Sequence, residues 1–339
     1  MEKANIAIVG ATGAVGVTIR EILEERKFPV DNLYLLASER SAGERLMFNG
    51  KSVMVRDLAD FDFSQVDVAL FSAGGSISRE YAPKAVEAGC VVVDNTSENR
   101  YDDDIPLEVT EVNPERIADY KNRGIIANPN CSTMQLMVAL KPIQDAVGIE
   151  HINVCTYQAV SGSGQKAVEE LAKQTAELLN AREATAKVYD KQIAFNVLPN
   201  IDALQDNGYT KEEMKLAREP QKILDDRTFS VSATAVRIPT AGGHSESVNV
   251  EFHQDFDLSE VRQTLHNTPG IIVQDNPDTK TYPMPMYANQ KDEVFVGRIR
   301  RDETQANALN MWIVSDNLRK GAATNAIQIA EYLVANMLV

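Results

Sequence analysis

The first part of the chain alternates short apolar runs with stretches of helical periodicity. Strands are predicted at 6–9, 33–37, 66–71 and 91–93, with helices that end near Arg26 and near Ala88. Asn49-Gly50, between two short apolar runs, predicts a β-hairpin. The repetition of strand, small polar turn and helix is typical of an α/β fold with a doubly wound parallel sheet, whose ligand lies beyond the carboxyl ends of the strands.

From about residue 150 the pattern changes. Strands are predicted at 151–160, 229–238, 245–252, 294–300 and 309–314, and helices at 165–181, at 211–224 and near the C-terminus. Because these strands follow one another without regular crossovers, we expect an α+β second domain with a mostly antiparallel sheet covered on one face by helices. The strands at 229–238 and 245–252 are expected to form an antiparallel pair, with His244 in their connection.

Composition narrows the classes of protein that fit. The 339 residues are enough for two domains, and 44% apolar with 24% charged residues is ordinary for a globular α/β protein. The formal net charge of -15 and the pI near 4.8 argue against a nucleic-acid or membrane surface, because the summed field repels polyanions. An anionic substrate must therefore meet a local basic cluster.

The cysteines indicate a reducing compartment. Cys90, Cys131 and Cys155 show neither a disulfide framework nor the spacing of zinc ligands, so no metal site is expected. The N-terminal residues lead straight into an apolar strand without the apolar core of a signal peptide, and no run of about 18 apolar residues occurs. We therefore expect a cytoplasmic protein.

The turn after the first strand is the first candidate for a binding site. Gly10, Gly13 and Gly16 lie between a predicted strand and a predicted helix. Glycines at this spacing let the backbone turn tightly, approach a pyrophosphate and pack the helix on the strand. In this context the turn indicates a Rossmann-type dinucleotide site rather than a plain tight turn.

The end of the second strand bears on which dinucleotide binds. Arg40, flanked by Ser38 and Ser41, suits the 2′-phosphate of NADP, whereas Glu39 could accept hydrogen bonds from the ribose hydroxyls of NAD. The residues favour NADP and leave NAD open. A solvated loop charge is the alternative role for Arg40.

Cys131 is the candidate nucleophile. Pro129 disfavours helix at Asn128, Asn130 is a good N-cap, and the apolar spacing at 134–140 predicts a helix, so Cys131 falls in its first turn. The helix dipole and unpaired backbone amides there favour the thiolate. A small buried cysteine that closes a strand-to-helix turn is the alternative.

Other polar residues could complete a site. His244 lies in a glycine-flanked loop, the usual place for a functional imidazole, whereas the other three histidines suit an outward strand position, a strand start and the last turn of a helix. Gln158 lies near a strand end, where it could donate to a carbonyl oxygen or be an ordinary side chain at the edge of the strand ladder. The Ser-Gly-Ser-Gly loop that follows has amides that could receive an anionic or amide group. Arg100 could equally form a surface ion pair. Glu219 and Lys222 lie three apart on one helix face, a spacing that is usually a solvated ion pair.

These segments together resemble the aspartate-semialdehyde dehydrogenase family over essentially the whole chain. The resemblance is carried by Gly10 to Gly16, Asn128 to Thr133, Gln158, Arg237 to His244, and Ser315-Asp316-Asn317-Leu318. It implies that Cys131 is the acyl-carrying nucleophile and His244 the acid/base. It further implies that Gln158, Glu219 and Arg237 bind substrate, and that Arg100 and Lys222 bind phosphate.

The resemblance also implies cofactor contacts and a domain plan. Thr12, Gly13, Ala14, Val15, Arg40, Ser41, Ser161, Gly162 and Asn317 are the implied NADP contacts, in addition to Gly10, Gly16 and Ser38. The C-terminal helix of the family returns to the nucleotide domain, so residues 1–127 with 317–339 are expected to form the NADP-binding domain. Residues 128–316 would form the catalytic domain and the homodimer interface. The stretch 182–191 matches no motif.

The implied reaction is the NADPH-dependent reduction of L-aspartyl 4-phosphate to L-aspartate 4-semialdehyde and inorganic phosphate through a Cys131 thioester. This step leads to lysine by way of diaminopimelate, to methionine and to threonine. One rival is N-acetyl-γ-glutamyl-phosphate reductase, whose nucleophile usually follows Gly and precedes Tyr, unlike Asn130 and Ser132 here. A second rival is a protein that senses NADP without catalysis.

Overall fold

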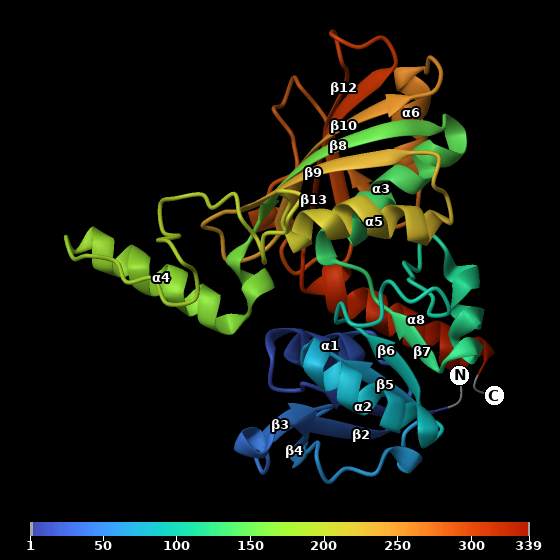
Figure 1. Cartoon of the computed structure of the whole chain (residues 1–339), viewed down its shortest axis with the longest axis vertical. Helices are drawn as coiled ribbons and strands as arrows, with labels where there is room; N and C mark the ends of the chain where they lie inside the picture. Colours follow the sequence, from blue (N-terminus) through green and yellow to red (C-terminus); the bar gives the residue numbers. More distant parts are fainter. Residues whose placement is uncertain (1–2, 338–339) are drawn as a thin grey trace. The chain divides into compact units, whose positions relative to one another are not determined.

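The chain folds into two compact units. The structure, a computed structural model, describes residues 3–337. Unit 1 comprises Met1–Asn130 and Ala322–Val339, and unit 2 comprises Cys131–Gly321. Each unit has its own β-sheet, as Figure 1 shows. The outermost residues of the predicted nucleotide domain, 1–2 and 338–339, lie outside the described residues.

Unit 1 contains the parallel sheet that the sequence predicts. Its strands lie in the order β3-β4-β2-β1-β5-β6-β7, and every neighbouring pair is parallel except β3 with β4. The elements are β1 Ala4–Val9, α1 Ala14–Glu25, β2 Val30–Ala37, β3 Arg45–Phe48, β4 Lys51–Asp57, β5 Val68–Phe71, α2 Gly75–Glu87, β6 Val91–Asp94, β7 Ile125–Ala127 and α8 Thr324–Asn336, with 3-10 turns at Glu39–Ser41, Phe63–Gln65 and Pro114–Asn122.

Apolar burial explains the arrangement of unit 1. The apolar stripes of α1 and α8 share one core with β1 and β5, to which Ile19, Ile327 and Ile8 contribute fully buried side chains. Helix α2 packs on β5 and β6. The predicted hairpin joins β3 to β4, and Asn49 and Gly50 both adopt positive φ (48° and 72°), as a two-residue turn between twisted strands requires.

Unit 2 contains a mixed sheet in the order β11-β12-β13-β10-β8-β9. Three neighbouring pairs are antiparallel, whereas β8 with β9 and β11 with β12 are parallel. The elements are α3 Cys131–Ala146, β8 Ile149–Gln158, a 3-10 turn Val160–Ser163, α4 Gln165–Leu179, α5 Lys211–Leu224, β9 Ser230–Arg237, β10 His244–Phe252, α6 Leu258–Asn267, β11 Ile271–Val273, α7 Pro285–Ala288, β12 Val294–Arg301 and β13 Ala308–Ser315. A π-helical turn, Arg319–Ala323, precedes α8. The strands of this sheet pair mostly antiparallel and helices pack against it, which confirms the predicted α+β second domain.

One predicted pairing is wrong. β9 and β10 are not neighbours, because β8 lies between them: it pairs in parallel with β9 and antiparallel with β10. His244 is consequently the first residue of β10 rather than part of a loop. The connection passes the end of β8, where Ile238 N donates to Gln158 O (3.0 Å) and Val160 N donates to Thr240 O (2.9 Å). Alternation reveals which face a strand buries but not which strand is its neighbour.

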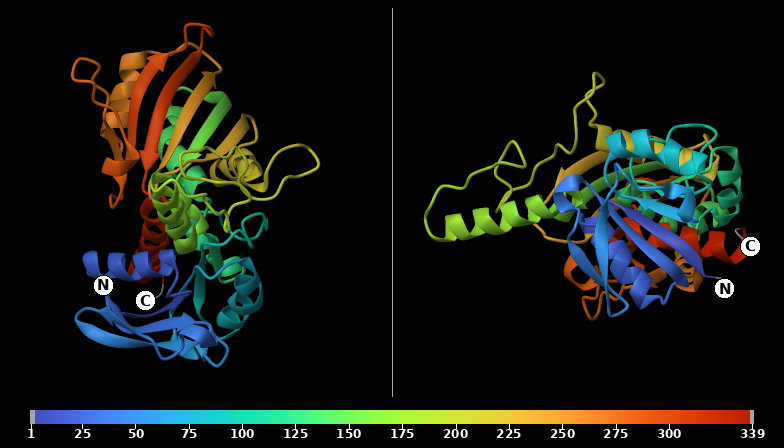
Figure 2. Two further views of the ribbon diagram at one scale, coloured as in Figure 1. Left: turned by 90° about the vertical axis from the view of Figure 1, so that its left-hand side faces the viewer. Right: turned by 90° about the horizontal axis from the view of Figure 1, so that it is seen from below.

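Helix α4 and the following segment extend from the sheet of unit 2, as Figure 1 and the right-hand view of Figure 2 show. The unmatched stretch 182–191 is held against this helix by buried side chains. The Glu170 carboxylate accepts from the backbone N–H groups of Lys187 and Val188, each at 2.7 Å, and Gln174 Nε2 donates to Thr185 O at 3.2 Å. The stretch therefore has a defined structure without forming a helix or strand.

Helix α3 is the central helix of unit 2. Most of its residues are buried, and it packs against α5, α6 and the sheet. It continues through Pro142 to Ala146, so this proline does not interrupt the helix.

Across residues 3–337, no helix combines the length and apolar character needed to cross a lipid bilayer.

Candidate active site

Cys131 is the first residue of helix α3 and is partly exposed, whereas the following turns of the helix are buried. Three residues earlier, Asn128 is held inside unit 1. Its Nδ2 donates to Asn95 Oδ1 (2.6 Å) and to Ala322 O (3.0 Å), and its Oδ1 accepts from Asn325 Nδ2 (2.6 Å). The chain is thus fixed just before the thiol, which lies at the positive end of the helix dipole.

Gly321, which the sequence analysis did not single out, contacts Cys131 directly. A Cβ atom on Gly321 would lie 2.9 Å from the Cβ of Cys131. Side-chain carbons do not approach this closely, so any larger residue at 321 would have to displace the thiol. The only sequence signal is a glycine between Lys320 and a pair of alanines, which gives no indication of what it contacts.

The other two cysteines are unsuited to nucleophilic chemistry. Burial raises the pKa of Cys90 to about 12, and burial also raises the pKa of Cys155. Both remain thiols at neutral pH, and a thiol is far less nucleophilic than a thiolate. Cys131 is therefore the cysteine whose location fits the predicted chemistry.

His244 is fully buried at the start of β10. The Ala159 N–H donates to its Nδ1 at 3.1 Å, so the neutral ring carries its proton on Nε2, which has no hydrogen-bond partner among residues 3–337. Burial, reinforced by the positive charge of Arg237 and opposed by Glu212, lowers the pKa of His244 to about 3. At pH 7 the imidazole is therefore a neutral hydrogen-bond donor.

Arg237 and Gln158 lie at the adjacent ends of β9 and β8, where they are paired in register. Arg237 Nη1 donates to Ala159 O at 2.7 Å, while its buried Nε has no partner in the described part of the chain. Gln158 Nε2 donates to Glu212 Oε1 at 3.0 Å, and Gln158 Oε1 accepts from Thr156. Glu212, on α5, is a supporting residue that the sequence analysis did not identify.

The predicted loop residues of unit 2 meet this group. A Cβ on Gly162 would lie 3.0 Å from Arg237 Nη1 and 3.3 Å from His244 Nε2. Asn317 Nδ2 donates to Ser161 Oγ at 3.0 Å, and Asn317 Oδ1 accepts from Gly243 N at 3.0 Å. Residues far apart in sequence thus converge, and the absence of a side chain at Gly162 lets the imidazole and the guanidinium approach its backbone closely.

In unit 1 the glycine turn has the geometry of a phosphate cradle. Gly10 has a φ of +91°, and a Cβ on Gly16 would lie only 2.2 Å from Gly10 O. Gly13 is the N-cap of α1 and provides no side-chain cap, so the positive end of this helix faces the turn without a competing side chain. Thr12 and Gly13 are exposed, and Ala14 and Val15 are partly buried. This arrangement fits a dinucleotide pyrophosphate.

The remaining predicted residues are placed as follows. Ser38, Arg40 and Ser41 follow the end of β2, in and before the 3-10 turn Glu39–Ser41. Arg40 is exposed, without an ion pair or hydrogen bond to any described residue. Arg100 is buried in unit 1, where it donates to Asn128 O and Asn95 O, both at 2.9 Å, so the surface ion pair is excluded as its main role. On α5, Glu219 is fully buried and Lys222 occupies the last turn.

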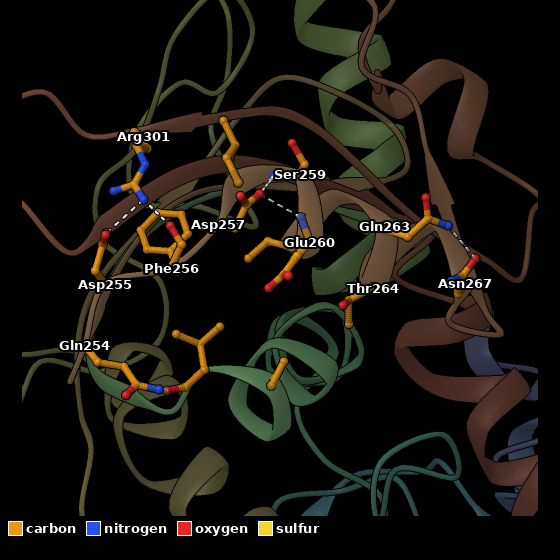
Figure 3. Close-up of a pocket in the computed structure, with 14 residues that line it drawn as sticks. Gln254, Asp255, Phe256, Asp257, Ser259, Glu260, Gln263, Thr264, Asn267 and Arg301 are labelled. Atoms are coloured by element: carbon orange, nitrogen blue, oxygen red, sulfur yellow. Dashed lines mark hydrogen bonds and ion pairs between the residues drawn. The ribbon is translucent and has the colours of Figure 1, made fainter.

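An open pocket of about 980 Å³ lies at the opposite end of β10 from His244, between α6 and the end of α3 (Figure 3). Its polar lining includes Gln254, Asp257 and Arg301, and none of the predicted site residues lines the pocket.

Within the described residues, no cluster of three or more His, Cys, Asp or Glu side chains is arranged to hold a metal ion.

Comparisons with known proteins cover nearly the whole chain. Residues 5–120 match the family described as "Semialdehyde dehydrogenase, NAD binding domain", and residues 140–320 match "Semialdehyde dehydrogenase, dimerisation domain". The aspartate-semialdehyde dehydrogenase of Legionella pneumophila is 57% identical over 99% of this chain and 97% of its own length. The crystal structure of aspartate semialdehyde dehydrogenase II complexed with ASA, from Vibrio cholerae, has a TM-score of 0.97 at 55% identity, covering 99% of this chain and all of that one. A Candida albicans aspartate semialdehyde dehydrogenase with NADP has a TM-score of 0.78 at 26% identity, with both chains fully covered.

Proposed function

The chain belongs to the aspartate-semialdehyde dehydrogenase family, and we propose that it reduces L-aspartyl 4-phosphate to L-aspartate 4-semialdehyde with NADPH. In the reverse direction it would oxidise and phosphorylate the semialdehyde. The observation that carries the proposal is the convergence of Gly162, Arg237 and His244 in unit 2, the unit in which Cys131 opens α3. A neutral hydrogen-bond donor and a cation that lie close together suit an acyl substrate that carries a carboxylate.

Cys131 is the proposed nucleophile. Its thiolate attacks the acyl phosphate carbon, the tetrahedral oxyanion expels phosphate, and a thioester to Sγ remains. The departing phosphate takes a proton from solvent. After reduction of the thioester carbonyl, the new oxyanion collapses to the aldehyde and releases the thiolate. The helix N-terminus favours the thiolate at the start and the end of this cycle.

His244 is proposed to stabilise the oxyanion in both halves of the reaction. Its protonated Nε2 has no other partner among the described residues, and the ring is neutral at pH 7. A neutral imidazole that donates a hydrogen bond can stabilise charge as it develops on the substrate oxygen. The acid/base role that the sequence predicts thereby becomes, in the reductive direction, that of a hydrogen-bond donor.

The remaining polar residues are proposed to bind the substrate. Arg237 can hold the α-carboxylate with its guanidinium, while Glu219 faces the α-amino group and Gln158 orients the acyl carbon. Arg100 and Lys222 supply the positive charge for phosphate that an otherwise acidic protein requires. Support comes from the burial of Arg100, Arg237, Gln158 and Glu219, because buried polar side chains are costly unless they have a structural or functional role.

NADP is the proposed cofactor, and it supplies the hydride when bound. The unit 1 residues proposed to hold it are Gly10, Thr12, Gly13, Ala14, Val15 and Gly16 at the turn, with Ser38, Arg40 and Ser41 at the 2′-phosphate; those from unit 2 are Ser161, Gly162 and Asn317. The preference for NADP rests on Arg40, whose guanidinium is exposed and not engaged by any described residue.

The wider assignments follow the same proposal. Residues 1–127 with 317–339 would bind the cofactor, and residues 128–316 would carry catalysis and the contacts of a homodimer, consistent with the description of the family that matches residues 140–320. The enzyme would act in the cytoplasm, in the synthesis of lysine through diaminopimelate, of methionine and of threonine.

Replacement of Cys131 tests the proposal. Cys131→Ala should abolish phosphate-dependent reduction of NADP by L-aspartate 4-semialdehyde and the acyl-enzyme seen by intact mass, while the Kd for NADPH stays unchanged. Cys155→Ala is the matched control and should keep full activity. Normal turnover by Cys131→Ala would end the proposal. Assaying wild type with N-acetyl-glutamate semialdehyde separates the rival reductase, and no turnover of either aldehyde would leave the NADP-sensing alternative.

A further inference from the structure

Glu246 is a buried acid that the proposed mechanism does not use. It lies on β10 two residues after His244, so both side chains point to the face of the sheet that α3 covers. Its neighbours in register are Thr156 on β8 and Ile313 on β13. The side chain is fully buried. The sequence signal is a charged residue at an inward position of a strand whose later inward positions, Val248, Val250 and Phe252, are apolar.

The carboxyl group of Glu246 faces helix α3, which begins at Cys131, and forms no hydrogen bond with any described residue. Neither of its oxygens, nor the Nε2 of Gln135 on α3, has a hydrogen-bond partner within residues 3–337. The Gln135 amide is nevertheless the polar group that interacts with Glu246. Ser315 Oγ donates to Gln135 Oε1 at 3.1 Å, which fixes the amide orientation and leaves Nε2 as the atom available to the carboxyl group.

No cation among residues 3–337 compensates a charge on Glu246. Its strand neighbours contribute a threonine and an isoleucine, and α3 contributes the uncharged Gln135. On β10 itself the nearest titratable group is His244, which is neutral at pH 7. No ion pair to Glu246 forms among the described residues. Burial accordingly raises the pKa of Glu246 well above its ordinary value of 4.5.

We propose that Glu246 is a neutral carboxylic acid that positions the Cys131 helix through Gln135 and keeps negative charge away from the first turn of α3. A protonated carboxyl group has both a donor and an acceptor, so it can accept from Gln135 Nε2 without a buried charge. Gln135 lies four residues after Cys131, one helical turn along the same face. Glu246 is thus a positioning residue, and this role rests on Cys131 being the nucleophile proposed above.

The protonation state matters because of its effect on the thiol. A carboxylate near the start of α3 would oppose the helix dipole and favour the thiol over the thiolate at Cys131. A neutral acid of the same shape fills the space and orients Gln135 without that penalty. Enzymes elsewhere keep a buried carboxyl group neutral so that it can donate a hydrogen bond.

Infrared difference spectroscopy tests the protonation state directly. At pH 7 the wild-type protein should show the carbonyl stretch of a protonated carboxylic acid, and Glu246→Gln should lack it. Glu251→Gln is the matched control, because Glu251 lies on the same strand but on the opposite face and is partly exposed. It should keep the band. Absence of a band that Glu246→Gln removes would overturn the proposal, whatever the activity of the enzyme.

The pH dependence of Cys131 alkylation by iodoacetamide tests the positioning role. Glu246→Gln, which keeps shape and neutrality, should leave the midpoint of alkylation within about 0.3 pH units and kcat within about threefold. Glu246→Leu removes the contact to Gln135 and should lower kcat by about 10- to 100-fold at nearly constant KM, as expected when a nucleophile is misplaced. Leucine is similar to glutamate in side-chain volume and needs no buried hydrogen-bond partner, so this variant should fold.

Two outcomes contradict the positioning role. A midpoint that falls by a full pH unit in Glu246→Gln would show that wild-type Glu246 is ionised. Wild-type kcat and alkylation in Glu246→Leu would show that the contact to Gln135 has no effect on Cys131. Failure of the proposed function is distinguishable from both, because Cys131 would then show no preferential alkylation at neutral pH even in the wild type, while the infrared band would remain.

Discussion

The two units build their functional groups in different ways. In unit 1 the glycine turn from Gly10 to Gly16 is a single local segment, and its conformation follows from its own residues and the two elements it joins. In unit 2, Gln158, Arg237 and His244 come from three strands and are brought together by the order of those strands. A local turn can be predicted from its sequence, whereas an assembled cluster depends on the topology.

The units also differ in how their polar atoms are treated. Arg40 and Thr12 of unit 1 are exposed, so water satisfies them at little cost. In unit 2, His244 Nε2, Arg237 Nε and both carboxyl oxygens of Glu246 are buried without partners among the described residues. Such atoms cost about 1–3 kcal/mol each when unsatisfied. Unit 1 also buries Arg20 Nε and Nη1 without partners among the described residues, so the contrast concerns the proposed site residues. Those of unit 2 are held as preorganised groups, whereas Arg40 and Thr12 of unit 1 offer an exposed surface for binding.

The largest effect is expected from breaking the assembled cluster. His244→Asn removes the Nε2 donor and should lower kcat by about 100- to 1,000-fold, the usual loss for an oxyanion donor. The Kd for NADPH, measured by quenching of protein fluorescence, should change by less than about twofold. Steady-state assays at saturating substrate provide the measurement. A loss of less than about tenfold would show that the imidazole does not face the reacting oxygen.

Local patterns predicted individual elements well. The boundaries of α5, Lys211–Leu224, agree with the prediction, because an amphipathic stripe and Thr210 as N-cap determine them locally. The helical location of Cys131 was predictable for the same reason. The three-residue strands β7 and β11 were not, since runs this short carry no period.

Contacts between segments that are distant in sequence could not be predicted from the pattern of hydrophobic and polar residues. The position of β8 between β9 and β10, the approach of Gly321 to Cys131 and the support of Gln158 by Glu212 all depend on which segments become neighbours. Burial of Glu246 could be suspected from its inward phase, but the absence of a cation around it could not. The sequence therefore predicts which residues matter more readily than which residues they touch.

A smaller effect is expected at the exposed end of the cofactor site. Arg40→Ala should weaken NADP binding by about 10- to 100-fold through loss of a charge-assisted hydrogen bond, and should change NAD binding by less than about threefold. Titration calorimetry with both cofactors gives the comparison, and kcat at saturating NADPH should stay near wild type. Equal losses for the two cofactors would show that Arg40 does not contact the 2′-phosphate.

The smallest effects concern stability, where His244 and Glu246 act in opposite directions. The folded-state pKa of His244 is lowered to about 3 from 6.5, so between these values the unfolded chain binds more protons and stability falls as the pH falls. The folded-state pKa of Glu246 is raised well above 4.5, so above that value the folded protein binds more protons and stability falls as the pH rises. Between pH 4.5 and 6.5 the two contributions oppose each other, each with a slope of about 1.4 kcal/mol per pH unit.

Two variants separate these contributions in urea unfolding at pH 5, 5.5 and 6. The free energy of unfolding of Glu246→Gln, relative to wild type, should increase by about 1.4 kcal/mol per pH unit, because the glutamine removes the group that loses stability as the pH rises. For His244→Asn the relative value should decrease with pH by a similar amount, since the group that gains stability is removed. Parallel pH curves for wild type and Glu246→Gln would mean that Glu246 has the same pKa folded and unfolded. Glu246, which lies against helix α3, would then be charged in the native protein, and the contrast between the preorganised groups of unit 2 and the exposed cofactor residues of unit 1 would fail at this buried acid.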